Sequence, residues 1–251
     1  MSEKSNVCAV VLAAGKGTRM KSELPKVATP LLGKPLILHV IDNLRKAEID
    51  DIVVVVGYKK EVVQSLLKDY SNIKFAEQKE QLGTGHALLS TESILSNYTG
   101  SILVCCGDVP LISPISFKSL YQNHKKHENI ATVLYAEIEN PFGYGRLIRK
   151  DSILKYIVEE KDANDEEKLS KEINTGTYVF ESPSVFEKLK SIGTNNAQGE
   201  YYLPDLIKIY NNEGQNTGAM KLLNYLESSG VNSPEDLQRL TNLLEEGKVT
   251  A

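Results

Sequence analysis

The sequence lacks the features that mark membrane-spanning, disulfide-stabilised and nucleic-acid-binding proteins. It has three cysteines, Cys8, Cys105 and Cys106, an odd number without a framework spacing, so we expect reduced thiols. No apolar run approaches the roughly 18 residues that cross a bilayer. The 29 basic and 33 acidic residues give a net charge of −4 without a dense basic cluster. We therefore expect neither a nucleic-acid nor a membrane partner.

The N-terminus also lacks the apolar stretch that follows the charges of a signal peptide. Together with the cysteine usage, this absence predicts a cytoplasmic protein. The hydrophobic fraction of 41% and the charged fraction of 25% are ordinary for a globular chain. A length of 251 residues without internal repeats fits one large α/β domain or two small ones.

Apolar, strand-like runs alternate with helical patterns through the first half of the chain. Ile52–Val56 consists of β-branched residues only and predicts a central strand buried on both faces. Four strand–helix units in a row predict an α/β fold with a mostly parallel sheet flanked by helices. The expected strands are Val7–Leu12, Ile52–Val56, Ile73–Ala76 and Ser101–Cys105, and the expected helices are Leu36–Ala47, Glu61–Leu67, one beginning near Thr84, and Pro114–Lys126.

The second half predicts a mixed, β-rich lobe that completes the sheet and walls one side of a cleft. Its expected strands are Ala131–Glu137, Arg146–Arg149, Ile153–Glu159 and Ile173–Phe180, with a polar connector at Asp162–Lys171. A short helix at Pro204–Tyr210 and a turn segment at Leu226–Asn232 follow.

A final amphipathic helix is predicted at Pro234–Gly247, with Ser233 as its N-cap. Its stripe of Leu237, Leu240, Leu243 and Leu244 could pack on the same domain or on a partner. We therefore divide the chain into a domain at 1–232 and a C-terminal helix segment at 233–251.

The loop after the first strand has the composition of a polyphosphate site. Gly15 and Gly17 allow close approach of backbone N–H groups to an anion, and Arg19 and Lys26 supply two cations. The spacing is neither that of a P-loop nor that of a complete dinucleotide fingerprint. The alternative is a tight strand-to-helix turn with solvated cations.

Two further segments carry polar groups at the expected ligand-binding edge of the sheet. Asp108 follows a buried strand and precedes Pro110, so it could hold Mg²⁺ or merely cap the turn. The run Gln78–Ala87 combines a strand end, a glycine turn and a helix start that could bind the polar edge of a base. His86, within it, more simply caps the helix or packs locally. His124 and His127 lie three residues apart in a Lys-rich helix, which favours a solvated face.

Read in order, these motifs resemble the sugar-nucleotide pyrophosphorylases. Leu-Ala-Ala-Gly-Lys-Gly-Thr-Arg-Met with Leu-Pro-Lys is followed by Glu-Gln-Leu-Gly-Thr-Gly-His-Ala and Gly-Asp-Val-Pro-Leu. Gly-Tyr-Gly-Arg, Val-Glu-Glu-Lys-Asp-Ala, Glu-Ile-Asn-Thr-Gly and Asn-Ala-Gln-Gly-Glu-Tyr-Tyr-Leu complete the series. The chain is most similar to the uridyltransferase domain of the bacterial N-acetylglucosamine-1-phosphate uridyltransferases. The resemblance implies a Rossmann-like mixed sheet of the nucleotide-diphospho-sugar transferase type, with a β-rich sugar-binding lobe.

The resemblance also implies a role for each matching residue. Arg19 and Lys26 would be catalytic and neutralise the triphosphate and the sugar phosphate. Asp108 and Asn232 would hold Mg²⁺. The nucleotide-binding set would be Leu12, Ala13, Ala14, Gly15, Gln78, Gly83 and Thr84, and the sugar-binding set Gly145, Glu159 and Asn174.

The implied reaction is Mg²⁺-dependent transfer of UMP from UTP to N-acetylglucosamine 1-phosphate. The alternatives are a nucleotidyltransferase for another sugar 1-phosphate and a catalytically silent subunit that binds nucleotide sugars. Cys106 stands where the family commonly has tyrosine. The family's bifunctional members continue into hexapeptide repeats with acetyltransferase activity; no such repeat occurs here, so we expect no acetyl transfer, and the oligomeric state stays open.

Overall fold

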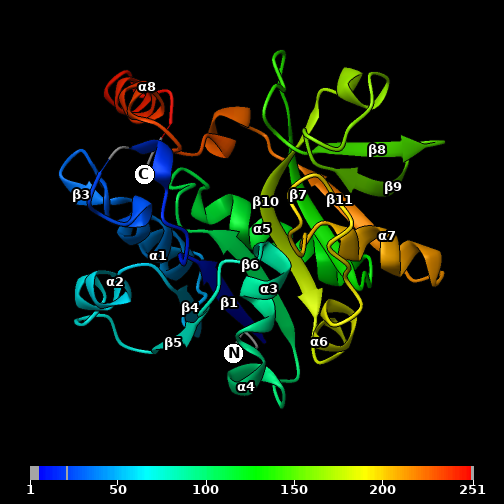
Figure 1. The fold of residues 1–251 in the computed structure, drawn as a ribbon, viewed down its shortest axis with the longest axis horizontal. Coiled ribbons are helices and arrows are strands. Elements are labelled where there is room, and N and C mark those ends of the chain that lie inside the picture. Colours follow the sequence, from blue (N-terminus) through cyan, green and yellow to red (C-terminus); the bar gives the residue numbers. More distant parts are fainter. Residues whose placement is uncertain (1–5, 21, 250–251) are drawn as a thin grey trace.

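A mixed sheet with a parallel core organises the computed structural model, which describes residues 6–20 and 22–249. Its central strand β1 (Val7–Leu12) lies between β4 (Ile52–Val56) and β6 (Ser101–Cys106), parallel to both. The strand order is β11-β7-β10-β6-β1-β4-β5 (Figure 1). The remaining strands of this path are β5 (Ile73–Glu77), β7 (Ala131–Glu137), β10 (Glu172–Glu181) and β11 (Thr217–Lys221). Because β10 is antiparallel to both of its neighbours, the predicted mostly parallel, mixed sheet is confirmed.

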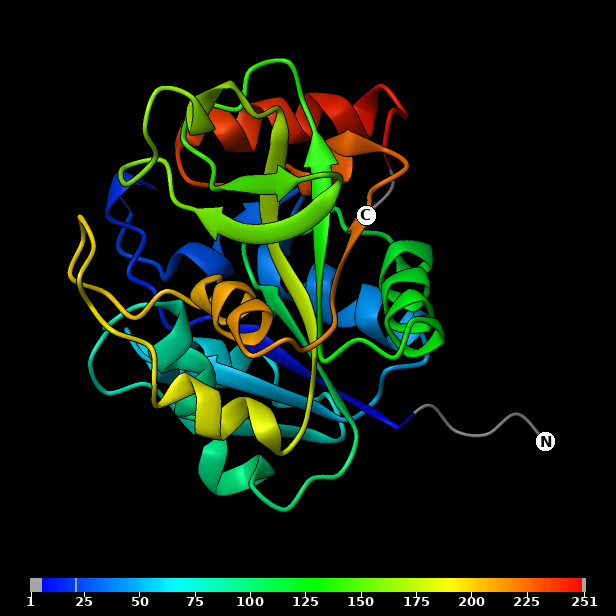
Figure 2. The same cartoon turned by 90° about the vertical axis from the view of Figure 1, so that its right-hand side faces the viewer.

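The alternation of side chains along β1 and β4 explains why the sheet is covered on both faces. Val7, Ala9 and Val11 point into one apolar cluster, while Cys8 and Val10 point into the other. On the first face lie α1 (Leu36–Lys46), α2 (Lys60–Leu66) and α5 (Pro114–Lys126). On the second face lie α3 (Thr84–Leu89), α4 (Glu92–Leu95), α6 (Ser184–Leu189) and α7 (Asp205–Asn212), as Figures 1 and 2 show from two sides.

The predicted β-rich lobe is a hairpin attached to the long strand β10. Strands β8 (Arg146–Lys150) and β9 (Ile153–Val158) pair antiparallel, and β8 joins β10 through Arg146 and Ile173. Arg146 is 2% exposed, and its Nη2 lies 2.7 Å from Glu160 Oε2. The polar connector after β9 contains one short 3-10 turn, η3 (Glu167–Leu169).

Several elements carry too weak a local pattern to be predicted from the sequence. The edge strand β11 reads Thr-Gly-Ala-Met-Lys and is a strand because it pairs with β7. The two-residue strands β2 (Pro30–Leu31) and β3 (Lys34–Pro35) and the helices α4 and α6 are also short. The turns η1 (Thr18–Met20), η2 (Lys26–Ala28) and η4 (Tyr225–Ser228) complete the fold.

The C-terminal helix α8 (Pro234–Glu245) begins at the predicted N-cap. Ser233 and Asp236 form a capping box, in which each side chain accepts a backbone N–H of the other residue. Leu240 is fully buried, and the other leucines of the predicted stripe pack beside it on Leu31 and Leu36 of the same chain. Residues 250–251 of the segment predicted at 233–251 lie outside the described residues, and the division after residue 232 stays a prediction.

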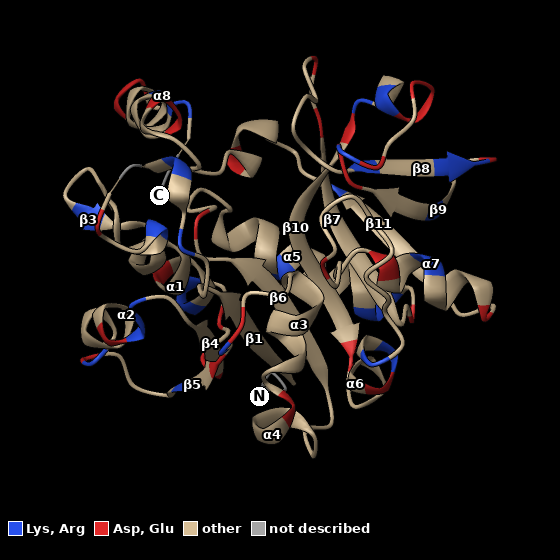
Figure 3. Ribbon diagram, viewed as in Figure 1, with Lys and Arg blue, Asp and Glu red and all other residues tan. Residues whose placement is uncertain are grey.

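The helices and the distribution of charged residues bear on the expectations drawn from composition. None of the helices in ranges 6–20 and 22–249 is long and apolar enough to span a bilayer. Figure 3 shows basic and acidic positions intermixed along the ribbon.

The prediction of a solvated histidine face on α5 is wrong for His124. His127 is exposed, but His124 is completely buried and lies 2.9 Å from both Thr132 Oγ1 and Glu181 Oε1. Glu181 also accepts hydrogen bonds from Ser101 and Lys125. The hydrogen bond from His124, followed by those from Lys125 and Ser101, lowers the pKa of Glu181 to about 2 against the opposing effect of burial.

We predict that Glu181→Gln destabilises the fold at pH 7 by up to about 3 kcal/mol. A carboxylate whose pKa falls on folding stabilises the protein above its ordinary pKa of 4.5, and this contribution is lost as the pH drops through about 2. Urea unfolding should therefore show a gap between variant and wild type that shrinks by more than half from pH 7 to pH 3. The control Glu139→Gln, at a 92% exposed side chain that pairs with Lys171, should change stability by less than about 1 kcal/mol. A pH-independent gap for Glu181→Gln would contradict the assignment.

Candidate active site

The two loops that the sequence singled out meet at the carboxyl ends of β1 and β6. Leu12 and Cys106 are the paired last residues of these strands, and Gly107 N–H donates to Leu12 O at 2.9 Å. The segment 13–28 therefore lies beside Gly107 and Asp108, as the topology predicts.

Two cations and two oxygen ligands from distant parts of the chain form one cluster here. The Lys26 ammonium pairs with the Asp108 carboxylate and donates to Asn232 Oδ1 at 3.0 Å. Arg19 Nη2 donates to the same Oδ1, also at 3.0 Å. Asn232 reaches this point because the Val231 N–H donates to Asp108 O at 2.9 Å. The Lys26 and Asp108 side chains are each 18% exposed, so the cluster is half-closed but reachable.

Only one of the two loop glycines is required for this cluster by close contact. Gly17 has φ of +67°, and a Cβ there would lie 2.5 Å from Lys26 Cβ. A Cβ on Gly15 would meet nothing within 4 Å, so space does not demand glycine there. Glycine at position 17 therefore lets the Lys26 side chain pack against the backbone of the loop.

Two of the remaining residues predicted to bind nucleotide, Ala13 and Ala14, have their side chains in the core. Ala13 and Ala14 are 2% and 4% exposed, and Ala13 N–H donates to Val55 O at 2.9 Å. Gly15 is exposed, and Leu12 lines the cavity described below.

The predicted base-binding turn is a close-packed unit. The Gln78 amide donates to Gly83 O at 3.0 Å and contacts His86 Nδ1 at 3.1 Å. Gly83 has φ of +109°, and a Cβ there would lie 2.7 Å from Tyr201 O. Thr84 follows as the first residue of α3. Any side chain at position 83 would force Tyr201 away from the turn.

The three predicted sugar-binding residues line one cavity of about 220 Å³. A Cβ on Gly145 would lie 3.1 Å from Glu159 Oε1, so glycine lets this carboxylate approach the backbone. Asn174 N–H donates to Gly145 O at 2.9 Å, and Asn174 Oδ1 accepts from Gly176 N–H at 2.9 Å. Predicted residues that line this cavity are Leu12, Thr84, Asp108, Gly145, Glu159, Asn174 and Asn232. Arg19, Lys26, Ala13, Ala14, Gly15, Gln78 and Gly83 are outside its lining.

Cys106, the departure from the family pattern, is part of the same cavity wall. Its thiol donates to Gly176 O at 3.7 Å, and a Cβ on Gly176 would meet Cys106 Sγ at 3.0 Å. Burial raises the pKa of this thiol to about 12. Position 106 therefore contributes a neutral, compact side chain.

Glu159 is the strongly perturbed acid of the cavity. Burial raises its pKa from 4.5 to about 7, and the nearby carboxylates of Asp205 and Asp162 add to the effect, while Arg146 opposes it. The Glu159 carboxyl group makes no hydrogen bond to any of the described residues. The pKa of the adjacent Glu160 shifts in the opposite direction. The pKa of Glu160 is lowered: burial would raise it, but the Gly143 N–H and the Arg146 guanidinium outweigh burial.

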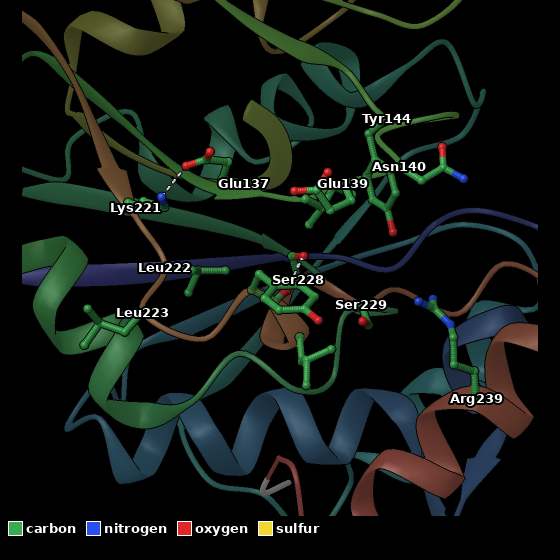
Figure 4. Close-up of a pocket in the computed structure, with 13 residues that line it drawn as sticks. Glu137, Glu139, Asn140, Tyr144, Lys221, Leu222, Leu223, Ser228, Ser229 and Arg239 are labelled. Carbon is green, nitrogen blue, oxygen red and sulfur yellow. Dashed lines mark hydrogen bonds and ion pairs between the residues drawn. The ribbon is translucent and has the colours of Figure 1, made fainter. Parts of the chain in front are cut away.

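A second, larger cavity of about 620 Å³ adjoins the first and shares Tyr144 and Ser228 with it. Figure 4 shows the ion pair of Glu137 and Lys221 on one side of it and Arg239 of α8 on the other. None of the predicted site residues lines this cavity. The candidate site is therefore the smaller cavity, which shares Asp108 and Asn232 with the cation cluster.

Two acids that sequence reasoning did not single out hold the Asn232 segment. Asp236 Oδ2 accepts the N–H groups of Asn232 at 2.9 Å and Ser233 at 3.1 Å. Glu227 Oε2 accepts the Ser113 N–H at 2.8 Å and so ties the segment to the start of α5. The capping-box spacing of Ser233 and Asp236 was a signal for the first, but no local pattern marked the second.

We predict that Glu159→Gln raises the free energy of unfolding at pH 8 by up to about 3 kcal/mol. A carboxyl whose pKa rises on folding costs nothing below 4.5, and its cost grows until the pH passes about 7. Denaturant unfolding at pH 5 and pH 8 should show a small gap at the lower pH and the full gap at the higher. The matched control Glu160→Gln should instead lower stability at pH 8. An equal effect of Glu159→Gln at both pH values would contradict the assignment.

A family pattern and curated relatives both match most of the length of this chain. The sequence pattern of the family described as nucleotidyl transferase matches residues 8–226. The bifunctional protein GlmU of Streptococcus sanguinis is 51% identical over 226 residues, which cover 89% of this chain and 49% of that protein. GlmU of Streptococcus mutans is 52% identical over 229 residues with the same two coverages. The chain thus spans about half the length of these curated relatives.

Solved structures share the fold at lower identity. A UDP-glucose pyrophosphorylase in complex with UDP-glucose superposes with a TM-score of 0.77 at 22% identity, covering 96% of this chain and 98% of that one. A putative glucose-1-phosphate thymidylyltransferase from Bacillus anthracis gives 0.76 at 23% identity, with 94% of each chain covered. These likenesses establish the nucleotide-diphospho-sugar transferase type of fold. On the family match over most of its length, the chain belongs to the nucleotidyl transferase family.

Proposed function

We propose that this chain transfers UMP from UTP to N-acetylglucosamine 1-phosphate, giving UDP-N-acetylglucosamine and pyrophosphate. The observation that carries the proposal is the cluster of Arg19, Lys26, Asp108 and Asn232. Asp108 and Asn232 belong to both this cluster and the wall of the cavity that holds Glu159. A phosphate at the cluster and a sugar in the cavity would therefore be adjacent. Because UTP is a cytosolic metabolite, the proposal implies that the reaction takes place in the cytoplasm.

The chemistry requires charge control more than proton transfer. An oxygen of the sugar phosphate attacks the α-phosphorus of UTP in line, a new P–O bond forms, and pyrophosphate leaves with the electron pair of the broken bond. The nucleophile is already ionised, so no general base is assigned. Arg19 and Lys26 bring two anions together and stabilise the charge of the transition state.

Asp108 and Asn232 fit a hard divalent cation, for which we propose Mg²⁺. One carboxylate and one amide oxygen already converge on a single positive centre, the Lys26 ammonium. The described residues contain no group of three or more potential metal-ligating acids, histidines or cysteines. A pair of oxygen ligands such as Asp108 and Asn232 suits an ion that keeps waters and phosphate oxygens. When bound, Mg²⁺ would neutralise phosphate charge and polarise the α-phosphate.

The proposal gives the remaining predicted residues separate tasks. Gln78, Gly83 and Thr84 bind uracil, and Leu12, Ala13, Ala14 and Gly15 pass their backbone along the nucleotide. Gly145, Glu159 and Asn174 bind the sugar and its acetamido group. Cys106 lines the same cavity, and in this proposal its compact thiol leaves room for the sugar.

The proposal is tested by pyrophosphate release from UTP and Mg²⁺ with N-acetylglucosamine, N-acetylgalactosamine and glucose 1-phosphates in parallel. Fast release with N-acetylglucosamine 1-phosphate, abolished by EDTA, is the expected result. Preference for another sugar would reassign the substrate within the family. Binding of UTP without release for any sugar would replace the proposal with a silent binding subunit.

We predict that Lys26→Met lowers kcat/KM on the order of 100-fold or more, because a positioned charge on the transition state is lost. Steady-state kinetics provide the measurement, with thermal unfolding to verify the fold. Lys118→Met, at a 49% exposed lysine that pairs with Glu48, is the matched control and should stay within about twofold of wild type. Equal activity of the two variants would remove Lys26 from the mechanism.

A further inference from the structure

The amide of Gln78 has its two N–H groups committed inside the protein. Gln78 is 3% exposed, and its Nε2 lies 3.0 Å from Gly83 O and 3.1 Å from His86 Nδ1. The amide oxygen Oε1 makes no hydrogen bond in the part of the chain that the structure describes. This oxygen is also not one of the fully buried side-chain atoms that lack a partner, so it stays reachable from outside. One acceptor of a nearly buried side chain is therefore left open.

Gly83 O and His86 Nδ1 determine which end of the Gln78 amide is oxygen and which is nitrogen. Gly83 O can only accept a hydrogen bond, so the NH₂ group must face it. With Nε2 in that position, His86 Nδ1 must accept the second amide hydrogen, and the imidazole proton sits on Nε2 of the ring. Turning the amide over would set its oxygen against Gly83 O. The pair of contacts leaves Oε1 as the amide atom without a partner.

The elements that carry these partners are themselves held in place. Gly85 N–H donates to Tyr201 O at 2.7 Å, and Leu203 N–H donates to Thr84 Oγ1 at 3.1 Å. The residue after His86, Ala87, is 4% exposed in the core beneath α3. His86 is thus a fixed acceptor and not a mobile surface group.

We infer that His86 is a positioning residue for base selection: it holds Gln78 so that Oε1 accepts from a base with an N–H donor. The inference rests on the proposed function, which places a pyrimidine at this turn. Uracil presents an N3–H donor, which matches Oε1. Cytosine presents an N3 acceptor, which would face the oxygen unpaired. A site that hydrogen-bonds a specific N–H rejects a ligand lacking it far more strongly than a shape-only site does.

The experiment measures equilibrium dissociation constants of UTP and CTP by calorimetry, without sugar phosphate, for wild type and three variants. Wild type should prefer UTP by about 100-fold or more. His86→Ala should lose at least roughly tenfold of that ratio, because the amide is then held by Gly83 O alone and Oε1 is no longer aligned with the N–H donor of the base. His86→Asn, whose Oδ1 can take the place of Nδ1 as acceptor, should keep the ratio within about threefold. Ser90→Ala, at the C-cap of α3, removes the Oγ hydrogen bond to His86 O without touching the imidazole and should leave the ratio unchanged.

A merely structural His86 would weaken UTP and CTP binding in parallel and leave their ratio intact, which would overturn the inference. Equal binding of UTP and CTP by wild type would overturn it as well. Because binding is measured without the second substrate, a chain that selects UTP yet releases no pyrophosphate would retain this inference and refute the proposed reaction.

Discussion

The contact of the Lys26 ammonium with Asp108 and Asn232 is the interaction on which the candidate site depends. It joins three segments that are far apart in sequence and ties the loop after β1 to the loop after β6 and to the start of α8. Gly17 gives Lys26 its room, the parallel pairing of β1 and β6 sets the two loops side by side, and Asp236 fixes Asn232. The carboxyl ends of the central strands thus carry a half-closed cluster in which two cations face one carboxylate and one amide.

The excess of positive charge in this cluster explains how one small region could accept two anionic substrates. A lysine paired with a carboxylate and an amide oxygen is oriented without being fully neutralised or withdrawn from solvent. A polyphosphate would compete for the cation, while a divalent ion would compete for the oxygens. If a phosphate replaces Asp108 as the partner of Lys26 and a divalent ion replaces Lys26 as the partner of the oxygens, every polar group stays paired. The cluster is therefore suited to ligand binding.

The sequence predicts the sheet well and the site only in part. Long β-branched runs such as Ile52–Val56 show where the buried strands lie, whereas β11 becomes a strand only through its pairing with β7. The Gly15–Lys26 loop and Asp108 are recognisable from local chemistry, but Asn232 enters only through family resemblance, because its place depends on long-range contacts. His124 was misjudged because its lysine-rich neighbours suggested solvent, while its own side chain turns toward Glu181. The roles of the site residues themselves stay predictions.

The most direct test of this account is a crystal structure of the chain with UTP and Mg²⁺. We predict that the Lys26 ammonium has left Asp108 for a phosphate oxygen, and that Asp108 and Asn232 ligate the metal. Uracil should lie at the turn of Gln78 and Gly83. An intact Lys26–Asp108 pair, with the nucleotide bound elsewhere, would contradict the central claim.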